Sequence, residues 1–569
     1  MSNFLSQPVY RGAAFLRNKL GNLTWGPLVS LARSAVLAQL APIAVGTLVI
    51  IDEPRGGERL VFGQQDDEQQ QPPTNGATTK PNGTAAALPA NGNHHKSSSN
   101  NSSQRPAYPG RSNPPPPPRV ELTVRSEAFW TRLALFADMG FAEAYMLGEV
   151  DVAVAAADRD GGSGGAIAKP KAQGDTVGDA QPTTDEKTTL DGNLGDACAS
   201  GPRAGGEGGQ PGRGGGSGGD GLAAFFRLFV LNRDALGDGA TPLSALVGAV
   251  AGLARAANTL PTARLNVAAH YDLGNDMFAA FLSPDMTYSC PIWREVRGEG
   301  QEESLQQAQM TKLQRFIDGA RIKPTDHVLE IGTGWGSFAI EAVRQTGCRV
   351  TTLTLSREQK ALAEARIAAE GFADRIEVLL MDYRALPVPE TPYDKIVSIE
   401  MLEAVGEKFL GTYFARVHQL LKRDGGIAVF QCITMPEGRH AAYSRREDFI
   451  NHYIFPGGYL PSITQLLNHI TTESKGTLIV EKVENIGGHY ARTLRLWREQ
   501  FLANFDERIR PALMKQHPGM GQEDVEVFRR KWEYYFAYCE AGFVTKTLGD
   551  VIITVGREGA VELMEGIPL

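Results

Sequence analysis

The stretch Val328-Leu-Glu-Ile-Gly-Thr-Gly-Trp-Gly-Ser337 has the pattern of a buried strand that breaks into a glycine-rich turn and enters a helix. Gly332, Gly334 and Gly336 lack a Cβ atom, so the backbone of such a turn can approach a ligand closely. Domains that bind NAD, FAD or S-adenosylmethionine all use a turn of this kind. The motif therefore predicts a nucleotide-like cofactor, and the neighbouring residues must decide which one.

Strand and helix patterns alternate on both sides of this turn, without low-complexity interruption, from about Thr262 onward. Short apolar runs bounded by turn residues predict strands over 328–331, 349–353, 376–380, 395–399 and 426–431, and helices are expected between them over 337–346 and 357–370. This alternation is typical of an α/β domain with a doubly wound parallel sheet.

Three features near the turn distinguish between the cofactors. An NAD site needs an acidic residue about twenty residues after the first glycine, and the segment Thr351-Thr-Leu-Thr-Leu-Ser356 has none. Glu330 precedes the turn, where methyltransferases of this fold commonly keep an acid. Asp382 follows the third strand, where its carboxylate could accept a hydrogen bond from an adenine amino group. Together they favour S-adenosylmethionine over a dinucleotide.

The N-terminal part of the chain is interrupted twice by segments with few apolar residues. Residues 64–119 are rich in Gln, Asn, Ser and Pro, and residues 155–220 are dominated by Gly. Both compositions predict disorder. The remaining pieces predict one interrupted domain, in which a helix ends near Ala41, a strand over 46–51 pairs with a strand over 120–124, and helices cover 128–146 and 222–231. The expected pieces are therefore 1–63, 120–154 and 221–261, followed by a second domain over 262–560.

Charge and cysteine content exclude several classes of protein. The formal charge of −8 argues against a nucleic-acid-binding protein. The five cysteines form no CxxC pair, so neither a metal site nor a disulfide framework is indicated. The apolar stretch over 27–51 is interrupted by Arg33, Gln39 and Pro42, which makes it a poor membrane-spanning helix. We expect no transmembrane segment.

Several ordered motifs resemble the cyclopropane-fatty-acyl-phospholipid synthase family, which includes the mycolic acid cyclopropane synthases. They include His270-Tyr-Asp-Leu-Gly-Asn-Asp-Met-Phe278, Met286-Thr-Tyr-Ser-Cys290, Leu353-Thr-Leu-Ser-Arg-Glu-Gln359, Ser398-Ile-Glu-Met-Leu-Glu-Ala-Val-Gly406, Tyr453-Ile-Phe-Pro-Gly-Gly-Tyr459 and Gly487-Gly-His-Tyr490. The resemblance implies a Rossmann-like class I methyltransferase domain behind a smaller α+β lipid-binding domain. It also implies methyl transfer from S-adenosylmethionine to the double bond of an unsaturated phospholipid acyl chain, which forms a cyclopropane or a methylene branch.

The resemblance also assigns the residues of the site. The cofactor is expected to be lined by Tyr288, Ser289, Glu330, Gly332, Gly334, Gly336, Thr354, Leu355, Gln359, Asp382 and Tyr383. The family holds a bicarbonate ion as general base. Its expected holders are the backbone of Cys290 and of Ile433, the carboxyl group of Glu403 and the hydroxyl group of Tyr490, while Tyr271 would face the developing cation.

The sequence departs from the family at Gln431, where well-known members have a histidine. A glutamine amide can donate and accept hydrogen bonds but cannot carry a proton away, so Gln431 is expected to orient the base.

The remaining expectations concern partners and alternatives. We expect a cytoplasmic protein that associates peripherally with a membrane surface and binds no nucleic acid, and a homodimer is left open. Three alternatives also stay open, namely a methyltransferase acting on sphingolipids, a catalytically inactive lipid-binding protein and a dinucleotide oxidoreductase.

Overall fold

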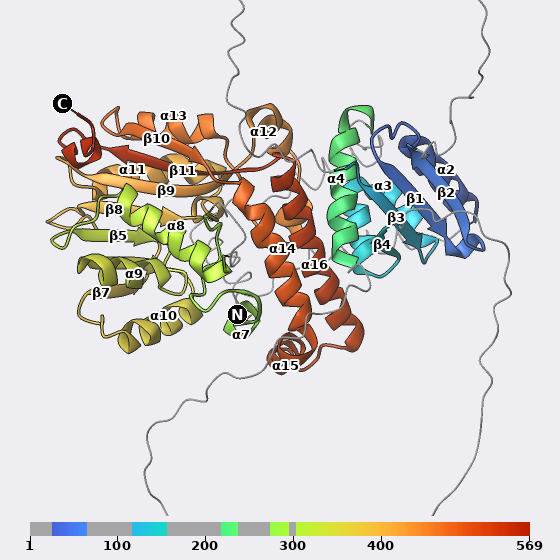
Figure 1. Cartoon of the computed structure of the whole chain (residues 1–569), viewed down its shortest axis with the longest axis horizontal. Helices are drawn as coiled ribbons and strands as arrows, with labels where there is room; N and C mark the ends of the chain where they lie inside the picture. The colour runs from blue at the N-terminus through green and yellow to red at the C-terminus, as the bar shows by residue number, and fades with distance from the viewer. Residues whose placement is uncertain (1–25, 65–115, 156–217, 237–273, 295–302, 569) are drawn as a thin grey trace, which may run out of the picture. The chain divides into compact units, whose positions relative to one another are not determined.

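A seven-stranded sheet forms the centre of the C-terminal part of the protein (Figure 1). The computed structural model describes residues 26–64, 116–155, 218–236, 274–294 and 303–568. The strand order is β10-β11-β9-β8-β5-β6-β7. The strands are β5 (His327–Ile331), β6 (Arg349–Thr354), β7 (Ile376–Leu380), β8 (Lys395–Ile399), β9 (Ile427–Thr434), β10 (Ile479–Asn485) and β11 (Gly549–Gly556).

Apolar side chains alternate along the central strands and form a core on each face of this sheet. Val328 belongs to the core that includes α8, α9 and α10, whereas its neighbour Leu329 belongs to the core that includes α11 and α13. The sheet is therefore covered on both faces, as expected of a Rossmann-like α/β domain. These helices are α8 (Leu305–Gly319), α9 (Ser337–Thr346), α10 (Arg357–Ala369), α11 (Leu410–Leu420) and α13 (Ile463–Glu473).

Further helices follow the chain around the sheet. They are α7 (Asn275–Phe281), α12 (Glu437–Tyr443), α14 (Gly488–Ala503), α15 (Arg510–Gln516) and α16 (Gln522–Val544). Short 3₁₀ turns cover Leu402–Ala404, Glu407–Phe409 and Val561–Met564, and π-helical turns cover Ile450–Ile454 and Phe505–Ile509.

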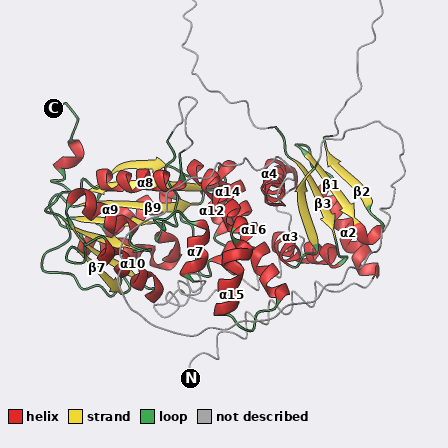
Figure 2. Ribbon diagram, turned by 60° about the horizontal axis from the view of Figure 1, so that its bottom comes forward, coloured by secondary structure: helices red, strands yellow, loops and turns green. Residues whose placement is uncertain are grey.

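A separate four-stranded sheet with the order β2-β1-β3-β4 lies in the N-terminal part (Figure 2). Its strands are β1 (Thr47–Asp52), β2 (Glu58–Gly63), β3 (Arg119–Val124) and β4 (Val150–Val154), and a short 3₁₀ turn at Glu53–Arg55 joins the first two. Its helices are α2 (Gly26–Leu40), α3 (Ala128–Met146) and α4 (Gly218–Leu236). The long C-terminal helix α16 packs against both α3 and α4. This unit confirms the prediction of a smaller α+β fold in the N-terminal part of the chain.

Most predicted elements are confirmed. The expected helix over 128–146 coincides with α3, and the strand over 120–124 pairs in parallel with β1 across the intervening 65–115 segment. The helix expected over 222–231 begins earlier, at Gly218, where Asp220 forms an ion pair with Arg498 of α14 at 3.0 Å. Most of the two segments predicted to be disordered lies outside the described residues.

The five strands predicted from the sequence, β5 to β9, are all parallel as expected, and the sequence analysis did not predict the two further strands β10 and β11. β11 runs antiparallel to both β9 and β10. β11 follows the long helix α16 in the chain and lies between β10 and β9 in the sheet. Within the described ranges, no helix has both the length and the apolar content needed to cross a bilayer.

Candidate active site

The glycine-rich turn connects β5 to α9, and its three glycines serve different purposes. All three have positive φ angles, of 107° at Gly332, 52° at Gly334 and 87° at Gly336. A Cβ atom on Gly334 would meet no protein atom within 4 Å, so this residue presents bare backbone to open space. A Cβ atom on Gly336 would lie 3.3 Å from that of Ala363 in α10, so Gly336 permits the close packing of two helices.

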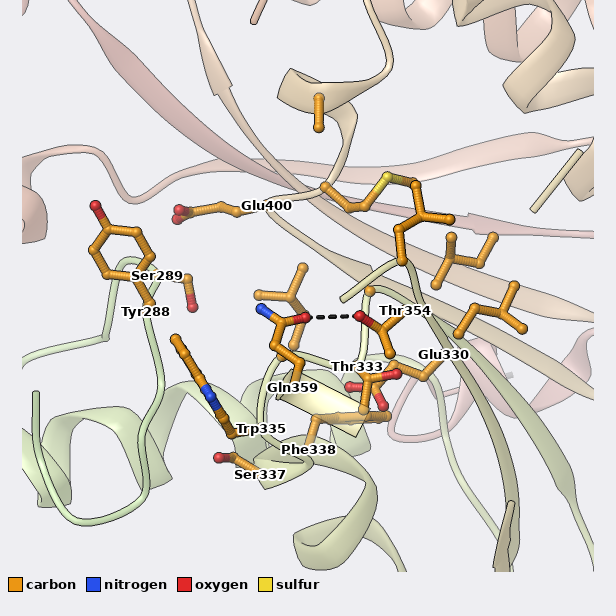
Figure 3. Close-up of a pocket in the computed structure, with 18 of the residues that line it drawn as sticks. Tyr288, Ser289, Glu330, Thr333, Trp335, Ser337, Phe338, Thr354, Gln359 and Glu400 are labelled. Carbon is orange, nitrogen blue, oxygen red and sulfur yellow. Dashed lines mark hydrogen bonds between the residues drawn. The ribbon is translucent and has the colours of Figure 1, made fainter. Parts of the chain in front are cut away.

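A cavity opens beside this turn, at the carboxyl ends of β5, β6 and β8 (Figure 3). Ten of the eleven residues expected to line the cofactor border it, and Gly336 is the exception. They come from the loop before α8, the glycine turn, the end of β6 with the start of α10, and the loop after β7. In α/β sheets, ligands bind at this edge of the strands.

The lining groups fit a ligand with both polar and apolar parts. Thr354 donates a hydrogen bond to the amide oxygen of Gln359 at 2.8 Å, and Figure 3 shows the amide nitrogen on the opposite side of that side chain. The hydroxyl groups of Thr287 and Tyr383 are buried and have no hydrogen-bond partner among the described residues. Asp382 is already held by Arg384 at 2.7 Å. Unsatisfied buried hydroxyls at a cavity are the groups that a bound cofactor would satisfy.

Burial controls the charges at the base of this cavity. It raises the pKa of Glu330 to about 8, although a hydrogen bond from Thr352 at 2.6 Å opposes the shift. Burial also lowers the pKa of Lys312, whose Nζ donates to Ser289 Oγ at 2.6 Å. Both shifts favour the uncharged forms of these side chains, so the base of the cavity carries less charge than one carboxyl group and one amino group would suggest.

A second, larger cavity of about 590 Å³ adjoins the first. Its volume lies within the range of small-molecule pockets in proteins. The wall is mainly aliphatic and aromatic and is drawn from α2, α3, α4 and α16, with Phe141, Phe225, Phe226, Tyr534 and Tyr538 among its residues. The N-terminal and C-terminal parts of the chain thus build it jointly. The charged members of the wall are Asp138, Arg233, Glu400, Glu403, Arg439 and Asp448.

Three residues border both cavities, namely Tyr288, Glu400 and Ala404. The Tyr288 hydroxyl group is paired with that of Tyr535 at 2.9 Å. The carboxyl group of Glu400 extends toward Tyr288 (Figure 3). Groups bound in the two cavities would meet beside these residues.

The carboxyl group of Glu400 is the centre of a hydrogen-bond network. Its Oε1 accepts from the backbone N–H of Cys290 at 2.8 Å and from the side-chain amide of Gln431 at 2.6 Å. Its Oε2 accepts from the hydroxyl group of Tyr490. The same Gln431 amide donates to Asp550 Oδ2 at 2.8 Å.

Two more carboxyl groups lie beside Glu400. Glu403 accepts from the backbone N–H of Ile433 at 2.5 Å, and burial together with the nearby charge of Glu400 raises its pKa to about 8. Burial, with Glu400 again contributing, also raises the pKa of Asp550. Closely spaced carboxyl groups cannot all ionise, so protons are shared within the cluster.

The structure thus brings together five of the six predicted catalytic residues, which are Cys290, Glu403, Gln431, Ile433 and Tyr490. Tyr271 lies outside the described residues. Sequence reasoning missed Glu400 and Asp550. Glu400 directly follows β8, at the strand edge where ligands bind, and this position was a usable signal. Asp550 gave no comparable local signal.

Comparisons with known proteins match the C-terminal part. The model of the mycolic acid cyclopropane synthetase family matches residues 259–552. A tuberculostearic acid methyltransferase of Mycobacterium tuberculosis is 44% identical over 299 residues, which are 52% of this chain and 66% of that protein. The cyclopropane-fatty-acyl-phospholipid synthase of Escherichia coli is 34% identical over 296 residues, which cover 52% of this chain and 69% of that protein. The crystal structure of a mycolic acid cyclopropane synthase complexed with SAH and CTAB is 29% identical, with a TM-score of 0.44, covering 52% of this chain and 98% of that one.

Proposed function

Because the chain belongs to the mycolic acid cyclopropane synthetase family, we propose that it transfers a one-carbon unit from S-adenosylmethionine to the double bond of an unsaturated acyl chain in a phospholipid. The chain is an S-adenosylmethionine-dependent methyltransferase. The proposal that the substrate is an acyl chain rests on the two adjoining cavities. One is polar and lies beside the glycine turn, the other is apolar, and they meet at Tyr288, Glu400 and Ala404.

The residues of the first cavity fit the cofactor. Gly334 leaves space for it against bare backbone, and Thr287 and Tyr383 offer hydroxyl groups that lack partners in the described part of the chain. Gln359 can donate from its amide nitrogen, and Asp382 can accept from an adenine amino group while Arg384 holds it in place. When bound, S-adenosylmethionine supplies an electrophilic methyl group on a sulfonium centre.

The residues of the second cavity fit a long acyl chain. An alkene is a weak nucleophile, so most of the rate enhancement must come from alignment and from exclusion of water. Aromatic rings of α16 and α4 offer apolar faces that attract a positive charge, each by roughly 0.5 to 2 kcal/mol. Arg233 and Arg439, which are exposed at the cavity wall, offer guanidinium groups to the phosphate of a phospholipid.

The product depends on whether a hydride shift precedes proton loss from the carbocation formed on the acyl chain. Loss of a proton from the added methyl group closes a cyclopropane ring. A hydride shift before that loss leaves a methylene branch, which is still an alkene. Both products are heavier than the substrate by one CH₂ unit.

The test uses the purified protein with S-adenosylmethionine and vesicles of a monounsaturated phosphatidylglycerol, followed by mass spectrometry of the released acyl chains. We expect a gain of one CH₂ unit, and hydrogenation of the product then separates the alternatives because only a methylene branch takes up hydrogen. A parallel reaction offers the same acyl chain as a free fatty acid, and its yield is compared with that from the phospholipid. Absence of any CH₂ gain with either lipid would contradict the proposal and favour a catalytically inactive lipid-binding protein.

A further inference from the structure

The carboxyl group of Glu400 occupies the donor set that the family resemblance assigns to a bicarbonate ion. The backbone N–H of Cys290 and the amide of Gln431 both donate to its Oε1, and the hydroxyl group of Tyr490 donates to its Oε2. Cys290 and Tyr490 each have a single proton to donate here, and both are used. An additional anion beside Glu400 would also bring two like charges into contact. The residues of this site therefore do not fit a bound bicarbonate.

We propose that Glu400 is itself the proton acceptor that ends the reaction, an inference that rests on the proposed function. Its place in the molecule supports this role. Tyr288, Glu400 and Ala404 border both cavities, and Glu400 is the ionisable carboxyl group among them. A proton acceptor must lie where the methyl group meets the double bond, because the cation forms there.

The backbone of Glu400 is held in an uncommon conformation that supports a functional role. Its φ angle is +48°, in the left-handed region that non-glycine residues rarely adopt. Its backbone N–H donates to the carbonyl oxygen of Gln431 at 3.0 Å, which ties the position to β9. Such strained residues cluster at functional sites. The side chain of Glu400 extends toward Tyr288, which borders both cavities (Figure 3).

The proposed step balances as follows. The methyl group has formed a carbon–carbon bond to one alkene carbon, its bond to sulfur has broken, and the other alkene carbon carries the positive charge. Glu400 takes a proton from the added methyl group, and the electron pair of that C–H bond closes the ring. After a hydride shift, the same acceptor takes the proton from the methyl group and the electron pair forms the methylene double bond. In both cases Glu400 ends as a neutral acid.

Burial raises the pKa of Glu400, and the hydrogen bonds that its carboxyl group accepts from Tyr490 and from the backbone of Cys290 oppose this shift and favour Glu400 as the anionic member of its cluster. The titratable groups that interact with it are Glu403, Asp550, Lys312, Cys290, Tyr490, Tyr535 and Cys432. Three hydrogen bonds donated to one carboxylate stabilise its ionised form. Asp550 has one such donor and a buried Oδ1 without a partner among the described residues, so the shared proton lies on Asp550 rather than on Glu400. Lys312 adds a nearby positive charge that favours the Glu400 anion.

The first experiment measures bicarbonate binding without turnover. ¹³C-labelled bicarbonate is titrated into the full-length protein saturated with S-adenosylhomocysteine and followed by ¹³C NMR line broadening. We expect no saturable binding to the wild type. Glu400→Gly removes the carboxylate, leaves a residue that tolerates a positive φ and frees the three donors, so it should bind bicarbonate. Saturable binding to the wild type that Tyr490→Phe abolishes would overturn the assignment.

The second experiment measures turnover in buffer purged of carbon dioxide. The wild type should keep its full rate, and Glu400→Gln should lose about 100-fold or more, as expected for removal of a general base. Glu400→Gly should be similarly slow and should regain activity with added formate or bicarbonate. Lys475→Gly is the matched control, because Lys475 is an exposed non-glycine residue with a φ angle of 58° and lies outside the site.

The outcomes separate the two proposals. A wild type that slows in purged buffer and recovers with bicarbonate would overturn the role of Glu400 while leaving the methyl transfer intact. So would a Glu400→Gln variant with full activity in that buffer. A wild type that transfers no methyl group to any acyl lipid would instead contradict the proposed function, and the binding experiment would still decide between Glu400 and bicarbonate.

Discussion

The side-chain amide of Gln431 donates a hydrogen bond to Oε1 of Glu400 across 2.6 Å, and this contact joins the centre of β9 to the end of β8. Gln431 is fully buried, so no water can replace the bond if the amide is lost. We therefore propose that Gln431 positions the carboxylate, because an amide can donate and accept hydrogen bonds but cannot carry a proton away.

Replacing Gln431 by Leu should move the pH profile of the enzyme. Loss of a hydrogen bond to a buried carboxylate disfavours its charged form, which raises the pKa of Glu400 further. The ionised form is the one that accepts the proton, so activity rises with pH, and the rising limb of kcat/KM should move to higher pH. Gln345→Leu on α9, outside the site, is the control. An unchanged profile with a uniformly lower rate would indicate a merely structural role for Gln431.

The buried Glu330 should make the stability of the cofactor-free protein depend on pH. Its pKa is raised from 4.5 to about 8 by burial, so the folded state keeps a proton that the unfolded chain has lost between these values. The free energy of unfolding should therefore fall as pH rises from about 4.5 to 8, by a few kcal/mol in total. Urea denaturation at several pH values measures this fall. Glu330→Gln should show a smaller fall, and Glu364→Gln on the exposed face of α10 should behave as the wild type. Equal slopes for all three proteins would contradict the prediction.

Gly334→Val should abolish cofactor binding while the fold survives. The new side chain would project into the first cavity, since a Cβ atom at this position meets no protein atom within 4 Å. Calorimetry with S-adenosylhomocysteine should show binding to the wild type and none to the variant, and NAD should bind neither. Gly347→Val is a matched control, because Gly347 also has a positive φ angle and an unobstructed Cβ position but lies at the other end of α9. If the Gly347→Val control also lost binding, backbone strain rather than a blocked cavity would explain the effect.

Ala134→Trp should impair the lipid substrate and spare the cofactor. Ala134 of α3 lines the apolar cavity, so an indole ring there would shorten the space for an acyl chain. Turnover with a long-chain phospholipid should fall by roughly tenfold or more, with unchanged affinity for S-adenosylhomocysteine. Ala368→Trp on α10 is an exposed control. A rate equal to that of the wild type would show that the acyl chain binds elsewhere.

The sequence and its family resemblance predicted most of the residues that line the first cavity. The glycine turn, Gln359, Asp382 and the strands that carry them are local features, because each depends on residues within a few positions of its own strand end. Ten of the eleven expected lining residues border the same cavity, and two of them, Tyr288 and Ser289, come from the loop before α8 and were assigned by the family resemblance. Gly336 differs because its lack of a side chain serves the packing of α9 on Ala363 of α10.

Only the tertiary structure decided which carboxyl group stands at the centre of the second half of the site. Glu400 and Glu403 belong to one short motif, and the left-handed backbone at Glu400 directs its side chain to groups from distant segments. Cys290 lies 110 residues before it, and Tyr490 lies 90 residues after it. The apolar cavity likewise needs α3, α4 and α16 to come together. A sequence pattern determines local turns and the faces of strands and helices, whereas contacts between segments this far apart depend on how the sheet and helices pack.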